Sequence, residues 1–174
     1  MKKYLKILLV LTVSFVLVGC GEKAKPNGQI GDETKTPSEQ EEIRHVICKL
    51  EKDDATSGYK LVTDYDLTVE GELVNQNKMK EVIISSSKET LKYFEDYLKN
   101  TYDTMNKKYG GYNFTVTNDG TQVVAETVVD YTIMNVAQAV QDDASMKAMV
   151  NSDNKVTLAG VKSIYTTIGV KCNE

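Results

Sequence analysis

Polar and apolar side chains alternate along the segment from Tyr59 to Glu72. One parity carries large apolar residues such as Leu61, Leu67 and Val69, and the other carries Lys, Asp, Thr and Glu. A period of two places successive side chains on opposite faces of a strand. The pattern therefore predicts a long strand with one buried face and one wet face.

Two further strands are predicted beside it. Val46, Cys48 and Leu50 alternate in a strand that begins near Ile43. After the long strand, the polar run 75–78 is typical of a turn, and 79–85 then returns as an antiparallel neighbour.

Helical spacing replaces alternation after residue 85. Ser86-Ser87-Lys88-Glu89 fits a capping box, in which Ser86 accepts from the third helical amide. An apolar stripe then recurs every three or four residues until Gly110-Gly111, which predict the end of the helix. The stripe consists of Leu91, Phe94, Leu98, Thr101, Tyr102 and Met105.

A second hairpin and a helical block complete the pattern. Residues 112–116 alternate, Asn118-Asp119-Gly120 predicts a tight turn, and 122–133 returns as a strand. Helical spacing follows in short segments after Asn135 and in a last helix that Thr157 caps and Gly169 ends, leaving 170–172 extended. The predicted order is β-β-β-α-β-β-α-α: an α+β fold with an antiparallel sheet of about five strands and helices packed on one face.

The first twenty residues have the pattern of an export signal. Lys2, Lys3 and Lys6 precede an apolar run over 7–18, which is shorter than the roughly 20 residues of a membrane-spanning helix. Leu17-Val18-Gly19-Cys20 matches a lipobox. We expect cleavage before Cys20 and diacylglycerol on its sulfur, because two acyl chains give stable anchoring. An ordinary signal peptide, or an anchor that is never cleaved, is the alternative.

This assignment divides the chain into a lipoprotein signal peptide (1–19), a lipidated cysteine with a flexible tether (20–42) and one α+β domain (43–174). The formal net charge is −4 for the full chain, and loss of the three signal-peptide lysines brings it to −7. Nucleic-acid binding needs clustered Lys and Arg, so we expect no nucleic-acid partner.

Cys48 and Cys172 remain once Cys20 is assigned to the lipid. Thiols outside the membrane oxidise and stay oxidised, so we expect a Cys48–Cys172 disulfide. Two buried free thiols are the alternative. A metal site that uses the two cysteines is the third alternative, and the sequence disfavours it, because His45 is the single histidine and there is no Cys-x-x-Cys spacing.

No residue constellation specific to catalysis, a cofactor or a metal is present. His45 stands at the domain edge and is expected to be a surface residue. An enzyme reading would have to rest on carboxylates such as Asp64, Asp66 or Asp130, while the pairs 53–54 and 142–143 are more typical of a solvated surface. The tyrosines Tyr59, Tyr65, Tyr93, Tyr97 and Tyr102 could form a contact surface, but the rim of a core is the simpler interpretation.

Several of these segments together resemble the YehR-like small bacterial lipoproteins, which are built on a domain of unknown function (DUF1307). The resemblance covers residues 43–172 and lies in the lipobox Cys20, in the strand 46–50 (Val-Ile-Cys-Lys-Leu), in the alternating strand 59–69 and in 127–131 (Thr-Val-Val-Asp-Tyr). It implies an α+β lipoprotein with no established activity, and it supplies no functional residues.

Three functions stay open at this point. The first is a non-enzymatic binding or interaction module, anchored on the extracytoplasmic face of the cell membrane, whose partner is an envelope protein or a small ligand. The second is an envelope hydrolase that uses carboxylates, which a concave pocket with two perturbed carboxyl groups would favour. The third is a signalling peptide released from the tail of the signal peptide, which needs no feature of the domain.

Overall fold

The computed structural model describes residues 42–54 and 56–173 of the 174-residue chain. The predicted signal peptide (1–19), the lipidation at Cys20 and the tether up to residue 41 lie outside the described residues. Within them, no helix is long and apolar enough to cross a lipid bilayer.

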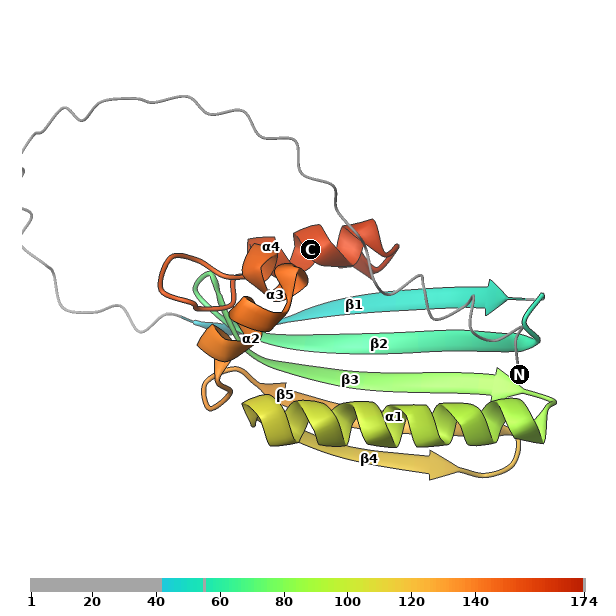
Figure 1. Cartoon of the computed structure of the whole chain (residues 1–174). Coiled ribbons are helices and arrows are strands. Elements are labelled where there is room, and N and C mark those ends of the chain that lie inside the picture. Colours follow the sequence, from blue (N-terminus) through green and yellow to red (C-terminus); the bar gives the residue numbers. More distant parts are fainter. Residues whose placement is uncertain (1–41, 55, 174) are drawn as a thin grey trace, which may run out of the picture. The chain divides into compact units, whose positions relative to one another are not determined.

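The described residues form one antiparallel sheet of six strands in the order β4-β5-β3-β2-β1-β6 (Figure 1). The strands are β1 (Ile43–Asp54), β2 (Tyr59–Glu70), β3 (Leu73–Ser85), β4 (Tyr112–Asn118), β5 (Gln122–Asp130) and β6 (Lys171–Cys172). The helices are α1 (Lys88–Tyr109), α2 (Val136–Asp142), α3 (Ala144–Met149) and α4 (Leu158–Thr167). The predicted α+β class with an antiparallel sheet is confirmed.

The last third of the chain holds one helix and one short strand more than the predicted order. Three helices follow β5 rather than two, because Asp143 divides the helical block. Its backbone N–H closes α2 on the carbonyl of Ala139, and its side chain caps α3 by accepting from Ser145 N at 2.7 Å. The extended segment predicted at 170–172 pairs with β1 and becomes the sixth strand.

The turn predicted at 75–78 was wrong. The chain turns at Gly71-Glu72, between the paired residues Glu70 and Leu73, and Gly71 has a φ of 56° that suits glycine. The polar run misled because Asn77 is a buried polar residue of β3, 4% exposed, whose amide donates to the Tyr165 hydroxyl at 2.9 Å.

Two predicted boundaries shift by a few residues. Ser87, not Ser86, caps α1 by accepting from Thr90 N at 3.1 Å, because the preceding strand continues to Ser85, opposite Tyr59. β5 ends at Asp130 rather than at residue 133, because the Asp130 carboxylate accepts from Thr132 N and turns the chain.

One face of the sheet carries the core, in two apolar clusters. Under α1, Leu91 and Leu98 pack with Ile83 of β3 and Val123 of β5. Under the C-terminal helices, Val161 and Tyr165 of α4 pack with Cys48, Leu67 and Val69. The helices therefore cover one face, as predicted, and Figure 1 shows α1 lying along β3, β5 and β4.

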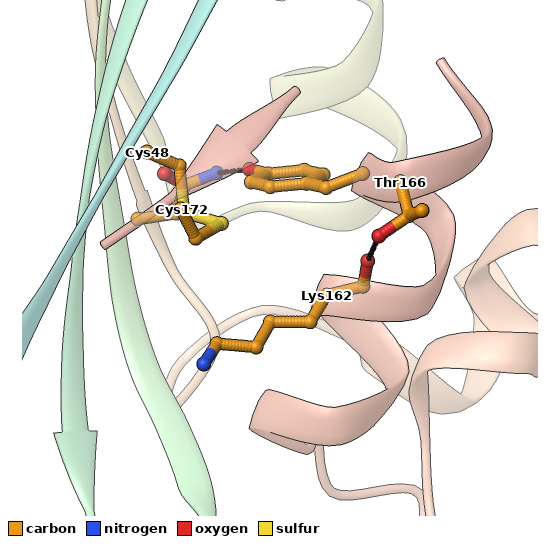
Figure 2. Close-up of a disulfide and its surroundings, with 6 residues drawn as sticks. Cys48, Lys162, Thr166 and Cys172 are labelled. Atoms are coloured by element: carbon orange, nitrogen blue, oxygen red, sulfur yellow. Dashed lines mark hydrogen bonds between the residues drawn. A yellow bond between two sulfur atoms is a disulfide. The ribbon is translucent and has the colours of Figure 1, made fainter. Parts of the chain in front are cut away.

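A disulfide ties the end of the chain to this core. Cys48 and Cys172 are directly opposite in the β1–β6 register, with a Cα–Cα distance of 3.9 Å and a bonded S–S distance of 2.04 Å. Figure 2 shows the bond beside α4, where the Thr166 hydroxyl donates to the Lys162 carbonyl at 2.8 Å. The pairing agrees with the one expected from the sequence.

Removal of this disulfide should destabilise the domain strongly. The bond joins residues 124 positions apart, and the chain-entropy model gives about 5 kcal/mol for closing so long a loop in the unfolded state. A Cys48→Ala/Cys172→Ala double variant should lose most of that free energy of unfolding, measured by urea denaturation. An unchanged urea midpoint, with or without reductant, would contradict this account of β6.

Candidate functional site

The sheet face opposite the helices carries the carboxylates singled out in the sequence. The strand register sets Lys49, Asp64, Lys80 and Glu126 side by side on β1, β2, β3 and β5. Charge alternates along this row, and Lys80 Nζ lies 3.4 Å from Glu126 Oε1. We call this surface the open face, because its side chains point away from the two apolar clusters.

A shallow hollow of about 480 Å³ lies at the centre of the open face. It runs across five strands and mixes charged side chains with apolar ones. Ile47 of β1 is 45% exposed there. Other residues of the open face that line the hollow are Asp64, Asp66, Lys78, Lys80, Asn113, Thr115, Glu126 and Val128.

His45 and Asp66 form a hydrogen-bonding contact beside this hollow. His45 Nδ1 lies 2.6 Å from Asp66 Oδ1, and both side chains are partly exposed. Asp66 also stands opposite Lys78 in the sheet. The expectation that His45 is a surface residue agrees with this position, and the contact leaves Asp66 between an imidazole and a lysine.

Asp130 lies at the end of β5 and is held as a structural turn residue. Thr132 donates to its carboxylate through the hydroxyl, at 2.5 Å, and through the backbone N–H, while Gln76 donates to the other oxygen at 3.0 Å. The hydrogen bond from the Thr132 hydroxyl is the main cause that lowers the pKa of Asp130. This carboxyl therefore stays ionised at neutral pH and is unsuited to act as a general acid.

The acidic pairs 53–54 and 142–143 do not form a joint site, because Asp53, Asp142 and Asp143 have separate partners. Asp142 lies 2.9 Å from Lys108 Nζ, which lowers the pKa of Asp142, and Asp143 caps α3. Asp53 faces Lys60 in the β1–β2 register. Within residues 42–54 and 56–173, no group of three or more His, Cys, Asp or Glu side chains could hold a metal ion.

Among the carboxyl groups that the structure describes, the one with a raised pKa is Glu81, on the helix-covered face. It shares its parity on β3 with Met79 and Ile83, and the Tyr102 hydroxyl of α1 donates to its Oε2. Burial raises the pKa of Glu81, and the hydrogen bond from Tyr102 opposes part of that rise. Burial and the nearby Glu81 charge raise the pKa of Tyr65 to about 12.

Glu81 and Tyr102 form a polar clasp between α1 and the sheet, and sequence reasoning missed it. The signal was present: Glu81 is the one carboxylate in the 79–85 strand and stands on its inward parity. The apolar centre of the strand, Val82-Ile83-Ile84, is continuous and does not alternate, so it does not indicate which face Glu81 is on.

The tyrosines divide between core and surface. Tyr65 packs on Tyr165 with ring centroids 4.6 Å apart, and Tyr102 packs on Phe114 at 5.6 Å, so both belong to the core. Tyr93 and Tyr97 stack at 6.1 Å on α1, and Tyr93 is 40% exposed. The core-rim interpretation thus holds for most of the group.

Comparison with known proteins identifies a fold and no activity. No family model matches the chain, and no curated protein matches it. The NMR structure of the E. coli YehR protein is similar, with a TM-score of 0.52 and 14% identity over 76% of this chain and 91% of that one. An NMR structure of a Streptococcus pneumoniae TIGR4 protein has a TM-score of 0.46 at 14% identity, over 90% of this chain and 100% of that one. The chain therefore has a YehR-like fold.

Neutralising Glu81 should stabilise the domain at neutral pH. Its pKa in the folded state lies above the ordinary 4.5, so the folded chain binds this proton more tightly than the unfolded chain, and stability falls as pH rises through that window. Glu81→Gln keeps an acceptor for Tyr102 and removes this loss. The gain in urea midpoint of Glu81→Gln over the wild type should therefore be larger at about pH 8 than at about pH 4.

Glu126→Gln is the matched control, because Glu126 lies on the open face, where its side chain is 62% exposed. Its pH dependence should stay close to that of the wild type. Tyr102→Phe removes the donor and should lower the free energy of unfolding by about 1–3 kcal/mol. A Glu81→Gln variant with an unchanged pH dependence would refute the buried clasp.

Proposed function

We propose that this chain is a bacterial lipoprotein of the YehR-like group (DUF1307), held by lipid on Cys20 to the extracytoplasmic face of the cell membrane. Its domain binds a protein partner in the cell envelope through the open face and carries out no catalysis. The lipobox, the YehR-like fold and the Cys48–Cys172 disulfide support the proposal. The disulfide is the type of bond that persists outside the cytoplasm.

The observation that carries the binding proposal is the composition of the open face. Its hollow crosses five strands, so it is broad as well as shallow. Small-molecule sites are concave and enclose most of their ligand, whereas protein interfaces are extended and join apolar contacts with polar ones. A half-exposed Ile47 among alternating charges fits the second description.

The same shallow surface disfavours the hydrolase alternative. Hydrolysis by carboxylates needs one carboxyl group that holds its proton near neutral pH. Asp64 and Asp66 line a shallow hollow that is open to solvent and does not enclose a substrate. Glu81 has the raised pKa, but it lies on the helix-covered face as part of a structural hydrogen bond.

The anchor is tested by the fate of Cys20. Mass spectrometry of the mature protein should find Cys20 as the first residue, with diacylglycerol on its sulfur. Cys20→Ala should remain unprocessed and carry no lipid, because the thiol that accepts it is gone. An unmodified thiol at residue 20 in the wild-type protein would disprove the anchor.

The partner surface is tested by photo-crosslinking in whole cells. A photoreactive amino acid at Ile47 or at Val128 should capture the same protein, because both residues line the hollow. The control position is Ile133, which is 73% exposed and follows the end of β5. Capture from Ile47 should fall about tenfold with Lys80→Glu, which reverses one charge of the row.

Equal capture from Ile133, or capture that Lys80→Glu leaves unchanged, would contradict a specific open-face partner. The free energy of unfolding of the Lys80→Glu variant, measured in urea, must stay within about 1 kcal/mol of the wild-type value, as expected for loss of an exposed ion pair. Saturable binding of a small envelope molecule in the hollow, with no captured protein, would favour the small-ligand alternative instead.

A further inference from the structure

Strand β4 forms an unpaired edge of the sheet within the described residues. The strand order puts β4 at one end, with β5 as its neighbour. The β4–β5 ladder runs from Tyr112 to Asn118 with no register shift. An edge of regular strand is a template for another strand, because its outward backbone groups are free to pair.

The outward backbone groups belong to Phe114 and Val116. At one end of the hairpin Asp119 N donates to the carbonyl of Gln122, and at the other Asp130 N donates to that of Gly111. Hydrogen-bonded pairs alternate along an antiparallel ladder, so the odd-numbered residues from 111 to 119 bond to β5. The N–H and C=O groups of Phe114 and Val116 therefore point away from the sheet.

β4 lacks the features that keep edge strands apart. Its seven residues, Tyr-Asn-Phe-Thr-Val-Thr-Asn, include no charged residue and no proline. At the opposite side of the sheet, β1 carries Arg, Lys, Glu and Asp side chains, and β6 pairs with part of it. Charges and covering segments protect edges in natural sheets, so β4 is the edge suited to pairing.

We propose that β4 pairs antiparallel with β4 of a second copy of this chain, around a twofold axis beside Thr115. Such pairing needs residues with outward backbone N–H and C=O groups to stand opposite each other. The register that uses the whole strand sets Phe114 opposite Val116 of the second copy. Asn113 then faces Thr117, and Thr115 faces its own copy. No like charges meet in this register, and aromatic–β-branched and Thr–Thr pairs are favourable cross-strand neighbours.

The helix above the edge has complementary charges for the same arrangement. Asn118 donates to Glu95 at 3.1 Å, and Asn106 accepts from Tyr112 N at 3.2 Å, so α1 runs antiparallel to β4 on the helix-covered face. The twofold axis makes the two α1 helices antiparallel neighbours. Lys99, which pairs with Glu95 of its own helix, then lies toward Asp103 of the other copy, which pairs with its own Lys107. Glu95 lies in the same way toward Lys107 of the second copy.

The paired sheets form one continuous surface. A twofold axis between antiparallel neighbours in a sheet is perpendicular to that sheet, so both helix layers lie on one side and both open faces on the other. The dimer does not depend on the proposed envelope partner, since the β4 edge contributes its own contacts. A failure of either proposal leaves the other standing.

Cysteine cross-linking of the full chain in membranes tests the register. Thr115→Cys should form a disulfide-linked dimer under mild oxidation, because directly opposite Cβ atoms in a sheet lie about 4.5–5.5 Å apart. Thr117→Cys alone should not, since its own copy is displaced by about 13 Å along the strand. Co-expression with Asn113→Cys should restore the cross-link, because these two positions face each other.

Val116→Pro in the Thr115→Cys background removes one outward N–H per copy and none of the bonds to β5. It should reduce cross-linking about tenfold, since each dimer loses two hydrogen bonds. Thr117→Cys that cross-links as readily as Thr115→Cys would overturn the register. A Thr115→Cys protein that stays monomeric while folded would overturn the dimer itself.

A charge exchange at the same position gives a measurement that needs no added cysteine. Thr115→Lys and Thr115→Glu each place like charges opposite one another and should make the full chain in detergent monomeric by light scattering. An equal mixture of the two variants should return to the mass of a dimer. A mixture that stays monomeric would contradict the twofold axis at Thr115.

Discussion

Burial of one face of the antiparallel sheet is the constraint on which the rest of this molecule depends. Strands β1–β5 alternate, so all inward side chains share one surface, and the helices must cover that surface alone. α1 covers the half formed by β3, β5 and β4, and the C-terminal helices cover the half around β1 and β2. The helices leave the open face and the β4 edge uncovered, and these are the two surfaces proposed for partners.

The two halves of the core are held by different bonds. Under the C-terminal helices, the Cys48–Cys172 disulfide fixes the chain end to β1, and Asn77 bonds to Tyr165 across the interface. Under α1, Glu81 and Tyr102 make the corresponding polar contact. The first pair of contacts is covalent or neutral, whereas the clasp contains an ionisable group, so the α1 half responds to pH.

Alternation and helical spacing predicted most elements, because strands with one buried and one exposed face alternate apolar and polar residues. The β2 strand, the stripe of α1 and the Thr157 cap of α4 are of this kind. Prediction failed where a polar side chain points toward the helix-covered face. Asn77 made the start of β3 resemble a turn, and the inward direction of Glu81 was missed, since their tertiary partners Tyr165 and Tyr102 lie far away in sequence.

The candidate surfaces were predictable only in part. The wet parity of β2 identified Asp64 and Asp66, but the order of the strands decides that Lys80 and Glu126 join them in one row. In the same way, the sequence of β4 shows the absence of charge, whereas its place at the sheet edge follows from the insertion of β5 between β4 and β3. The local sequence pattern therefore predicts which face of a strand a side chain is on, whereas the strand order determines which residues become its neighbours.

Carboxyl footprinting of the folded chain tests the one-sided sheet most directly, through Glu81 and Glu126. These residues lie on adjacent strands, in neighbouring rows of the register and on opposite faces. A water-soluble carbodiimide with an amine, followed by mass spectrometry, should modify Glu126 rapidly and Glu81 only after unfolding in urea. Equal modification of both residues in the folded protein would contradict the account.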